Sequence, residues 1–109
     1  MKIDERIKKS IEFDNIIKHG KFIKNKFFVV YYNFKKEVNS RFGIAVGTKI
    51  GNAVTRNKLK RQTREIIKEI KIEFKKDQDY IIMIRKECLN LNYQQKKENL
   101  LSLINKVDK

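Results

Sequence analysis

The segment Lys26–Phe34 constrains the fold more than any other part of the chain, because almost all of its residues are aromatic or β-branched. Such residues favour a β-strand, in which successive side chains point to opposite faces of the sheet. This alternation places Phe28, Val30 and Tyr32 on one face and Phe27, Val29 and Tyr31 on the other. Both faces are therefore apolar. We expect one face to pack on the core and the other to form a binding surface or a second packing contact, and the alternation does not say which.

The remaining apolar segments alternate between helical and strand-like spacing. The predicted order is a helix at 10–20, the strand at 26–34, a polar turn at 35–40, a strand at 41–48, a helix at 54–74, a strand at 79–85 and a last helix from Asn92. Ser10 is a good N-cap for the first helix, and Gly20 supplies its C-terminal stop. Gln95 stands three residues after Asn92, where a capping box requires it.

These segments predict an α+β fold. The order α-β-β-α-β-α, with the first strand whole or split in two, indicates a sandwich in which helices cover a sheet. A chain of 109 residues accommodates a single domain over residues 1–109. No apolar run approaches the roughly 20 residues that span a bilayer, and Met1 leads into charged residues rather than a signal peptide. We therefore expect a soluble, cytoplasmic protein.

The charge of the chain indicates an anionic partner. The 27 lysines and arginines outnumber the 13 aspartates and glutamates and leave a net charge of +14. Such an excess repels itself in a compact domain unless an anionic ligand compensates it. Nucleic acid is the first candidate and an anionic membrane surface is the second. Charge alone does not choose between them.

The predicted helix at 54–74 concentrates much of this charge on one face. At about 100° per residue, basic and amide side chains fall within an arc of roughly 140°. They are Arg56, Asn57, Lys60, Arg61, Arg64 and Lys68. The neighbouring arc carries an apolar stripe, Leu59, Thr63, Ile66, Ile70 and Phe74. Guanidinium groups bind phosphates bidentately and lysines add mobile charge, so this face is suited to follow a nucleic-acid backbone.

Aromatic residues in the first third of the chain form a second candidate site. The set comprises Phe13, Phe27, Phe28, Tyr31 and Tyr32. Bases of single-stranded RNA stack on exposed rings, each worth roughly 1–3 kcal/mol. Because a strand must bury one face, we expect at least half of these rings to belong to the core.

Catalysis by protein side chains finds little support in the sequence. The chain has one histidine, His19, and one cysteine, Cys88, so it lacks a cysteine–histidine metal cluster and a second general acid or base near neutrality. His19, just before Gly20, is typical of a helix C-terminus. Cys88 cannot form an intramolecular disulfide and is typical of a buried thiol in a reducing compartment. We expect no catalytic and no metal-binding residue in the protein.

The stretch from Arg41 to Glu65 resembles the signature of the bacterial ribonuclease P protein component. In that family a strand and a Gly-Asn-Ala-Val turn lead into a helix with the pattern Arg-Asn-Arg-x-Lys-Arg-x-x-Arg, which Gly51–Val54 and Arg56–Arg64 resemble here. Further counterparts in the same order are residues 12–20, the strand around Phe28 and Tyr31, and residues 79–86. The resemblance thus covers nearly the whole chain. It implies a sandwich of the ribosomal-protein-S5-domain-2 type with a left-handed β-α-β crossover, whereas the general rule favours a right-handed one.

The resemblance also implies a function. In the family a catalytic RNA subunit hydrolyses precursor tRNA and removes its 5′ leader, with magnesium bound mainly by the RNA as the cofactor. The protein binds this RNA and the precursor tRNA, and no obligate protein partner or membrane is implied. The positions implied for the catalytic RNA are Arg56, Asn57, Lys58, Lys60, Arg61 and Arg64. Those implied for a leader-binding cleft are Phe13, Ile17, Phe28 and Tyr31, flanked by Lys49, Arg85 and Lys86.

Two positions depart from the family pattern. Lys58 stands where many members have the second arginine of Arg-Asn-Arg, which keeps the charge but loses the planar fork. Ile17 stands where some members have a second phenylalanine of the cleft. We therefore expect weaker stacking on the leader in this chain.

Three other classes of protein compete with this interpretation. A ribosomal or other structural RNA-binding protein would share the charge and the sandwich, but would not need the Gly-Asn-Ala-Val turn or an aromatic cleft. A protein-only nuclease would require a second general acid or base. A membrane-surface protein would carry bulky apolar residues opposite lysines on an uncovered helix, whereas the apolar stripe at 54–74 has a sheet to cover.

Overall fold

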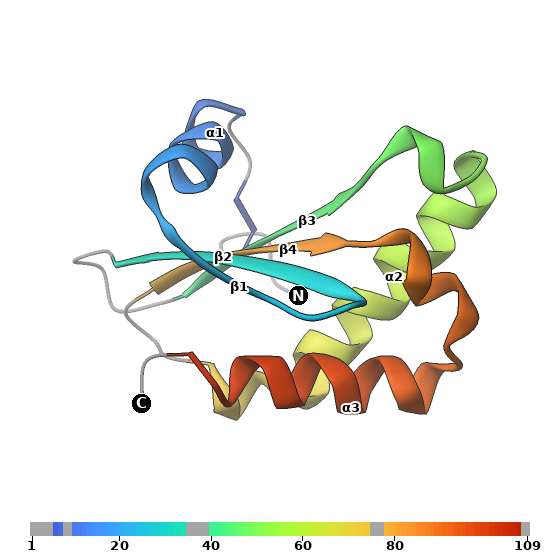
Figure 1. Ribbon diagram of the computed structural model, residues 1–109. Helices are drawn as coiled ribbons and strands as arrows, with labels where there is room; N and C mark the ends of the chain where they lie inside the picture. Colours follow the sequence, from blue (N-terminus) through green and yellow to red (C-terminus); the bar gives the residue numbers. More distant parts are fainter. Residues whose placement is uncertain (1–5, 8–9, 35–39, 75–77, 108–109) are drawn as a thin grey trace.

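The computed structural model describes residues 6–7, 10–34, 40–74 and 78–107, and places three helices around one four-stranded sheet (Figure 1). The strands are β1 (Lys21–Lys24), β2 (Phe28–Phe34), β3 (Arg41–Val46) and β4 (Gln78–Ile84). The helices are α1 (Ser10–His19), α2 (Ala53–Glu69) and α3 (Tyr93–Ile104), with short 3-10 turns η2 (Thr48–Ile50), η3 (Lys71–Glu73) and η4 (Lys86–Asn90). None of the described helices is long and apolar enough to cross a membrane.

The sheet is mixed, with the strand order β1-β2-β4-β3. Strand β2 pairs antiparallel with both β1 and β4, whereas β3 and β4 are parallel neighbours joined through α2. The α+β sandwich is confirmed, with the first strand split. The split occurs at Asn25, whose side-chain oxygen accepts hydrogen bonds from the N–H groups of Phe27 and Phe28, at 2.9 and 2.8 Å. Most of the predicted turn, residues 35–39, lies outside the described residues.

The structure decides which face of β2 belongs to the main core. Helices α2 and α3 cover one face of the sheet and α1 covers part of the other (Figure 1). Phe28, Val30 and Tyr32 point toward α2 and α3, and they are buried there with residues of β3 and β4. Phe27 packs against the same core instead of joining Tyr31, because it lies in the turn before β2, where strict alternation does not hold.

Helix α2 ends earlier than the predicted limit at Phe74. The regular helix stops at Glu69, and η3 follows. The chain becomes extended at Phe74, whose ring is buried edge-on against Phe42 and Tyr80, with centroids 4.9 Å from each. Burying this ring in the core therefore takes the place of another helical turn.

Helices α2 and α3 begin at asparagine caps, whereas Ser10, expected as the N-cap of the first helix, is the first residue of α1 itself. The side chain of Asn52 accepts a hydrogen bond from Thr55 N–H at the start of α2, at 2.9 Å. Asn92 and Gln95 form the predicted capping box of α3, with reciprocal hydrogen bonds of 2.8 and 3.0 Å. These local hydrogen bonds satisfy N–H groups that a helix leaves free in its first turn.

Candidate nucleic-acid interface

Three rows of side chains cross the face of the sheet that carries α1. The strand register places Asn33, Asp79 and Arg41 in the first row. Phe22, Tyr31, Ile81 and Gly43 form the second row. Lys24, Val29, Met83 and Ala45 form the third, which we call the open row. The first row lies nearest to the beginnings of β3 and β4, and the open row lies farthest from them. The rows therefore describe how far α1 extends over the sheet.

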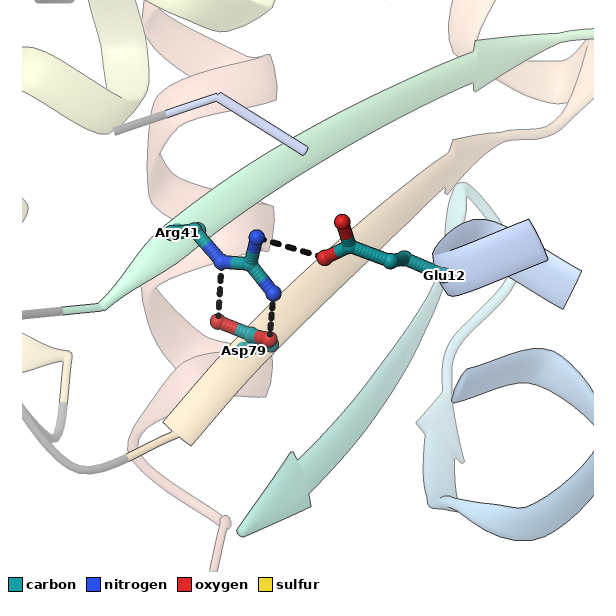
Figure 2. Close-up of polar contacts among 3 residues, drawn as sticks. All are labelled: Glu12, Arg41 and Asp79. Atoms are coloured by element: carbon teal, nitrogen blue, oxygen red, sulfur yellow. Dashed lines mark hydrogen bonds and ion pairs between the residues drawn. The ribbon is translucent and has the colours of Figure 1, made fainter. Parts of the chain in front are cut away.

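An ionic cluster joins α1 to the first row (Figure 2). Arg41 donates two hydrogen bonds to the carboxylate of Asp79, of 2.7 and 3.3 Å, and its other terminal nitrogen forms an ion pair with Glu12 of α1. Asp79 is buried, at 5% exposure. The bonds to Asp79, aided by Glu12 and opposed by burial, raise the pKa of Arg41, so this guanidinium stays charged at all ordinary pH values.

Phe13 of α1 lies directly against the backbone of β3 in the second row. A Cβ atom added to Gly43 would stand 2.4 Å from the Phe13 ring. Glycine at position 43 is therefore what allows this close approach. Phe13 and Ile17 are partly buried against a small cluster that contains Ile81 and Tyr31. The structure thus brings together three of the four predicted cleft residues.

The fourth predicted cleft residue, Phe28, does not join them. Its side chain is 0% exposed and lies in the main core, on the opposite face of the sheet from Tyr31. The prediction is wrong for Phe28 in this conformation. Successive side chains of β2 alternate between the two faces of the sheet, so residues 28 and 31 point to different faces. A ring buried in the core cannot stack on a base.

The open row extends this surface beyond α1. Val29, Ala45 and Met83 are partly exposed, whereas Ile81 in the second row is completely buried. Helix α1 stands over one end of the sheet only (Figure 1). Apolar side chains next to the Phe13–Tyr31 cluster therefore remain accessible. Sequence reasoning missed the open row, because it depends on the pairing of strands that are distant in the chain.

Basic residues gather where β3 and β4 end, next to the open row. Strands β3 and β4 are parallel, so Lys49 in η2 and Lys86 in η4 both follow strand ends at this edge, and both are exposed. Arg85 is partly exposed and donates a hydrogen bond to the Asn25 carbonyl, at 3.0 Å, which joins the end of β4 to the turn before β2. We call Lys49, Arg85 and Lys86 the basic edge. These are the three residues that the resemblance implies as flanks of the cleft.

Helix α2 presents its predicted basic face to solvent. Asn57, Lys58 and Arg61 are exposed and Arg56, Lys60 and Arg64 are partly exposed. We call these six residues the basic face. The neighbouring apolar stripe is buried as predicted, and the Thr63 hydroxyl donates to the Leu59 carbonyl, at 2.8 Å.

The charge of the basic face is not neutralised within the described part of the chain. The ion pairs among the described residues join Arg41 to Glu12 and Asp79, and Lys97 to Glu69 at 3.1 Å, and none of them includes a residue of the basic face. Glu69 of α2 is thus directed to α3 rather than to its basic neighbours. The buried Nε of Arg56 also has no hydrogen-bond acceptor among the described residues. This surface is therefore suited to phosphate groups.

Cys88 of η4 and Lys96 of α3 are both buried and interact with each other. Burial raises the pKa of the Cys88 thiol to about 11, with Lys96 opposing the shift, so Cys88 is a neutral thiol as the sequence predicts. Lys96 is 7% exposed, and its Nζ donates to the side-chain oxygen of Gln62, at 2.7 Å. Burial, with repulsion from Lys58, lowers the pKa of Lys96.

The described residues do not assemble a metal site. They contain no group of three or more histidine, cysteine, aspartate or glutamate side chains that could hold a metal ion. The paired carboxylates of Glu12 and Asp79 are bound to Arg41 (Figure 2). Magnesium prefers oxygen ligands and retains much of its own water. Among the described residues, therefore, no set of ligands fits a magnesium site.

A sandwich with an unneutralised basic helix and a partly exposed aromatic surface has the features of an RNA-binding protein. The family model described as Ribonuclease P matches residues 1–108. The chain is 43% identical over 102 residues to the ribonuclease P protein component of Bacillus cereus strain AH187, covering 93% of this chain and 89% of that protein. The chain belongs to the ribonuclease P protein family, the protein subunits of the endoribonuclease ribonucleoprotein that acts in tRNA processing.

Solved structures agree with this assignment. The RNase P protein from Thermotoga maritima superimposes with a TM-score of 0.87 at 34% identity, covering 96% of this chain and 99% of that one. The Staphylococcus aureus RNase P protein gives a TM-score of 0.85 at 37% identity, covering 92% of each chain. The predicted fold class, family and general function are therefore confirmed.

Proposed function

We propose that the protein binds two RNA partners on two surfaces. The basic face of α2 binds the catalytic RNA subunit. The α1-bearing face of the sheet binds the single-stranded 5′ leader of precursor tRNA, through Phe13, Ile17, Tyr31 and the open row. The observation that carries the proposal is the pairing of an unneutralised basic helix with a separate, partly exposed aromatic surface.

The two surfaces meet at the turn between β3 and α2. Lys49 of the basic edge lies in η2, three residues before the N-cap of α2 at Asn52. A leader on the open row would therefore leave the sheet beside the first turn of the basic helix. This places leader and catalytic RNA next to each other, and the basic edge lowers their mutual repulsion there.

Chemistry belongs to the RNA partner in this proposal. The carboxylates of the described residues form no metal-binding group, and those of Glu12 and Asp79 are bound to Arg41, so we assign the magnesium ions to the RNA. The protein holds the substrate and screens charge. Its effect is therefore expected to be largest at low magnesium, where the RNAs repel each other most strongly. The buried neutral thiol of Cys88 suits the reducing cytoplasm, where we place the assembled enzyme.

Cleavage of precursor tRNA by a bacterial ribonuclease P RNA tests the proposal. Reactions at low magnesium, with and without the protein, should use leaders of several lengths and include a protein-alone control. We expect stimulation that grows with leader length until the open row is filled, and no cleavage by protein alone. Equal stimulation with leaderless and long-leader substrates would contradict leader binding. Cleavage by protein alone would contradict the assignment of chemistry to the RNA.

A further inference from the structure

One exposed aromatic ring on the α1-bearing face belongs to none of the predicted sites. Four large apolar side chains are exposed in the described part of the chain: Ile11, Phe22, Val54 and Leu89. Phe22 is the only aromatic one among them, and it is 58% exposed. It lies in β1, an edge strand of four residues. A ring this exposed on an edge strand adds little to the stability of the fold. The residues around it therefore indicate which kind of partner it could bind.

The strand register places Phe22 next to a residue of the proposed leader surface. Phe22 is paired with Tyr31 across the β1–β2 hairpin, so the two side chains share a face of the sheet. Their ring centroids are 5.8 Å apart, with an angle of 44° between the ring planes. Tyr31, like Phe13 and Ile17, packs against the small buried cluster of Ile7, Ile16 and Ile81. Phe22 therefore continues the aromatic surface outward to the edge of the sheet.

The charge around Phe22 favours a polyanion as the occupant. Lys24 is exposed and belongs to the same face of β1, in the open row, and Lys18 and Lys21 are exposed just before it. The sequence from Lys18 to Phe34 contains no aspartate or glutamate. A second copy of this chain would bring the same positive charge to the contact. An RNA base flanked by phosphates matches both the ring and the lysines.

We propose that Phe22 is a leader-binding residue that stacks on a nucleobase beside Tyr31. This inference rests on the proposed binding of the leader to the α1-bearing face. It assigns to β1 the second ring that Ile17 does not supply from α1. The leader surface of this chain thus spreads across the β1–β2 hairpin instead of being concentrated under α1.

Steady-state cleavage by the reconstituted ribonucleoprotein tests the role of Phe22. Phe22→Ala should raise KM for a long-leader precursor tRNA by roughly tenfold, within the range for loss of one stacking ring, and leave a leaderless substrate unaffected. Phe22→Trp should retain affinity because it keeps a planar ring. Phe22→Leu keeps an apolar side chain without stacking and should resemble Phe22→Ala. Ile11→Ala, which removes an exposed apolar side chain from α1, is the matched control.

Fluorescence gives a direct readout of the stacked ring. The chain has no tryptophan, so Phe22→Trp creates a single reporter. Its emission should be quenched by long-leader precursor tRNA in the ribonucleoprotein and much less by leaderless tRNA. Ile11→Trp should respond equally to both. If the unmodified protein and Phe22→Ala distinguish leader lengths equally well, the role of Phe22 is refuted and the leader surface is not. If the unmodified protein ignores leader length, the proposed leader surface is refuted.

Discussion

The two faces of the sheet are covered to very different extents. Helices α2 and α3 close most of one face, and residues such as Phe28 and Ile82 have no exposed area there. Helix α1 covers only part of the first two rows of the other face, held by Arg41 and by the contact of Phe13 with Gly43, and Phe22 of the second row stays exposed. Identical residue types therefore serve stability on one face and remain available for binding on the other. Coverage, rather than residue type, separates core from candidate site.

Replacement of a ring on each face should give the largest contrast. Phe28→Ala should destabilise the protein by roughly 3–5 kcal/mol, because it leaves a cavity in the closed core. Tyr31→Ala should lower stability much less and weaken binding of long-leader precursor tRNA. Chemical denaturation and leader-dependent KM values measure the two effects. A stable Phe28→Ala protein with a selective loss of leader binding would return Phe28 to the site.

The position of α1 can be disturbed through Gly43. In Gly43→Ala, the new methyl group would collide with the Phe13 ring, and overpacking of this kind costs roughly 1–3 kcal/mol. We expect a lower melting temperature and a smaller stimulation by long leaders, since Phe13 must move. Gly47→Ala is the matched control, because its backbone is extended and no atom lies within 4 Å of the added Cβ. Equal behaviour of both variants would refute the proposed role of this contact.

The basic face should respond in RNA affinity rather than in stability. Arg61→Ala should weaken binding of the catalytic RNA by about tenfold and reduce the slope of log affinity against log salt by about one. Lys106→Ala removes the same charge from an exposed site after α3 and serves as the control. Binding titrations at several salt concentrations distinguish the two variants. Equal losses would indicate a response to net charge without a defined surface.

The closed side contains one charged group that burial disfavours, Lys96. Lys96→Met should stabilise the protein by about 1 kcal/mol at neutral pH, because it removes a buried ammonium without a carboxylate partner in the described structure. The lowered pKa means that the folded protein loses this proton more easily than the unfolded chain does. The free energy of unfolding should therefore rise with pH between the lowered pKa of Lys96 in the folded protein and the unfolded value of about 10.4.

Denaturation curves at several pH values test this sign. The advantage of Lys96→Met should be greatest at neutral pH and should shrink in the alkaline range, where the native lysine becomes neutral. Lys97→Met is the control, because Lys97 is partly exposed and paired with Glu69. An advantage of Lys96→Met that grows with alkaline pH would contradict the lowered pKa.

Patterns within a single segment predicted most of the fold correctly. The capping box of Asn92 and Gln95, the buried stripe of α2 and the order of elements all follow from interactions between residues a few positions apart. The same local reasoning missed β1 and extended α2 too far. Strand β1 is only four residues long and exists through pairing with β2, and α2 ends where the Phe74 ring enters the core.

By itself, the sequence determined the family, the basic face of α2 and the aromatic character of β2. These depend on residue identity and on the fixed geometry of helices and strands. Only the tertiary structure decided that Phe28 is core while Tyr31 lies on the α1-bearing face, with the exposed ring of Phe22 beside it. The physical reason is that both assignments depend on what covers each face of the sheet, and this cover comes from helices and strands that are distant in the chain.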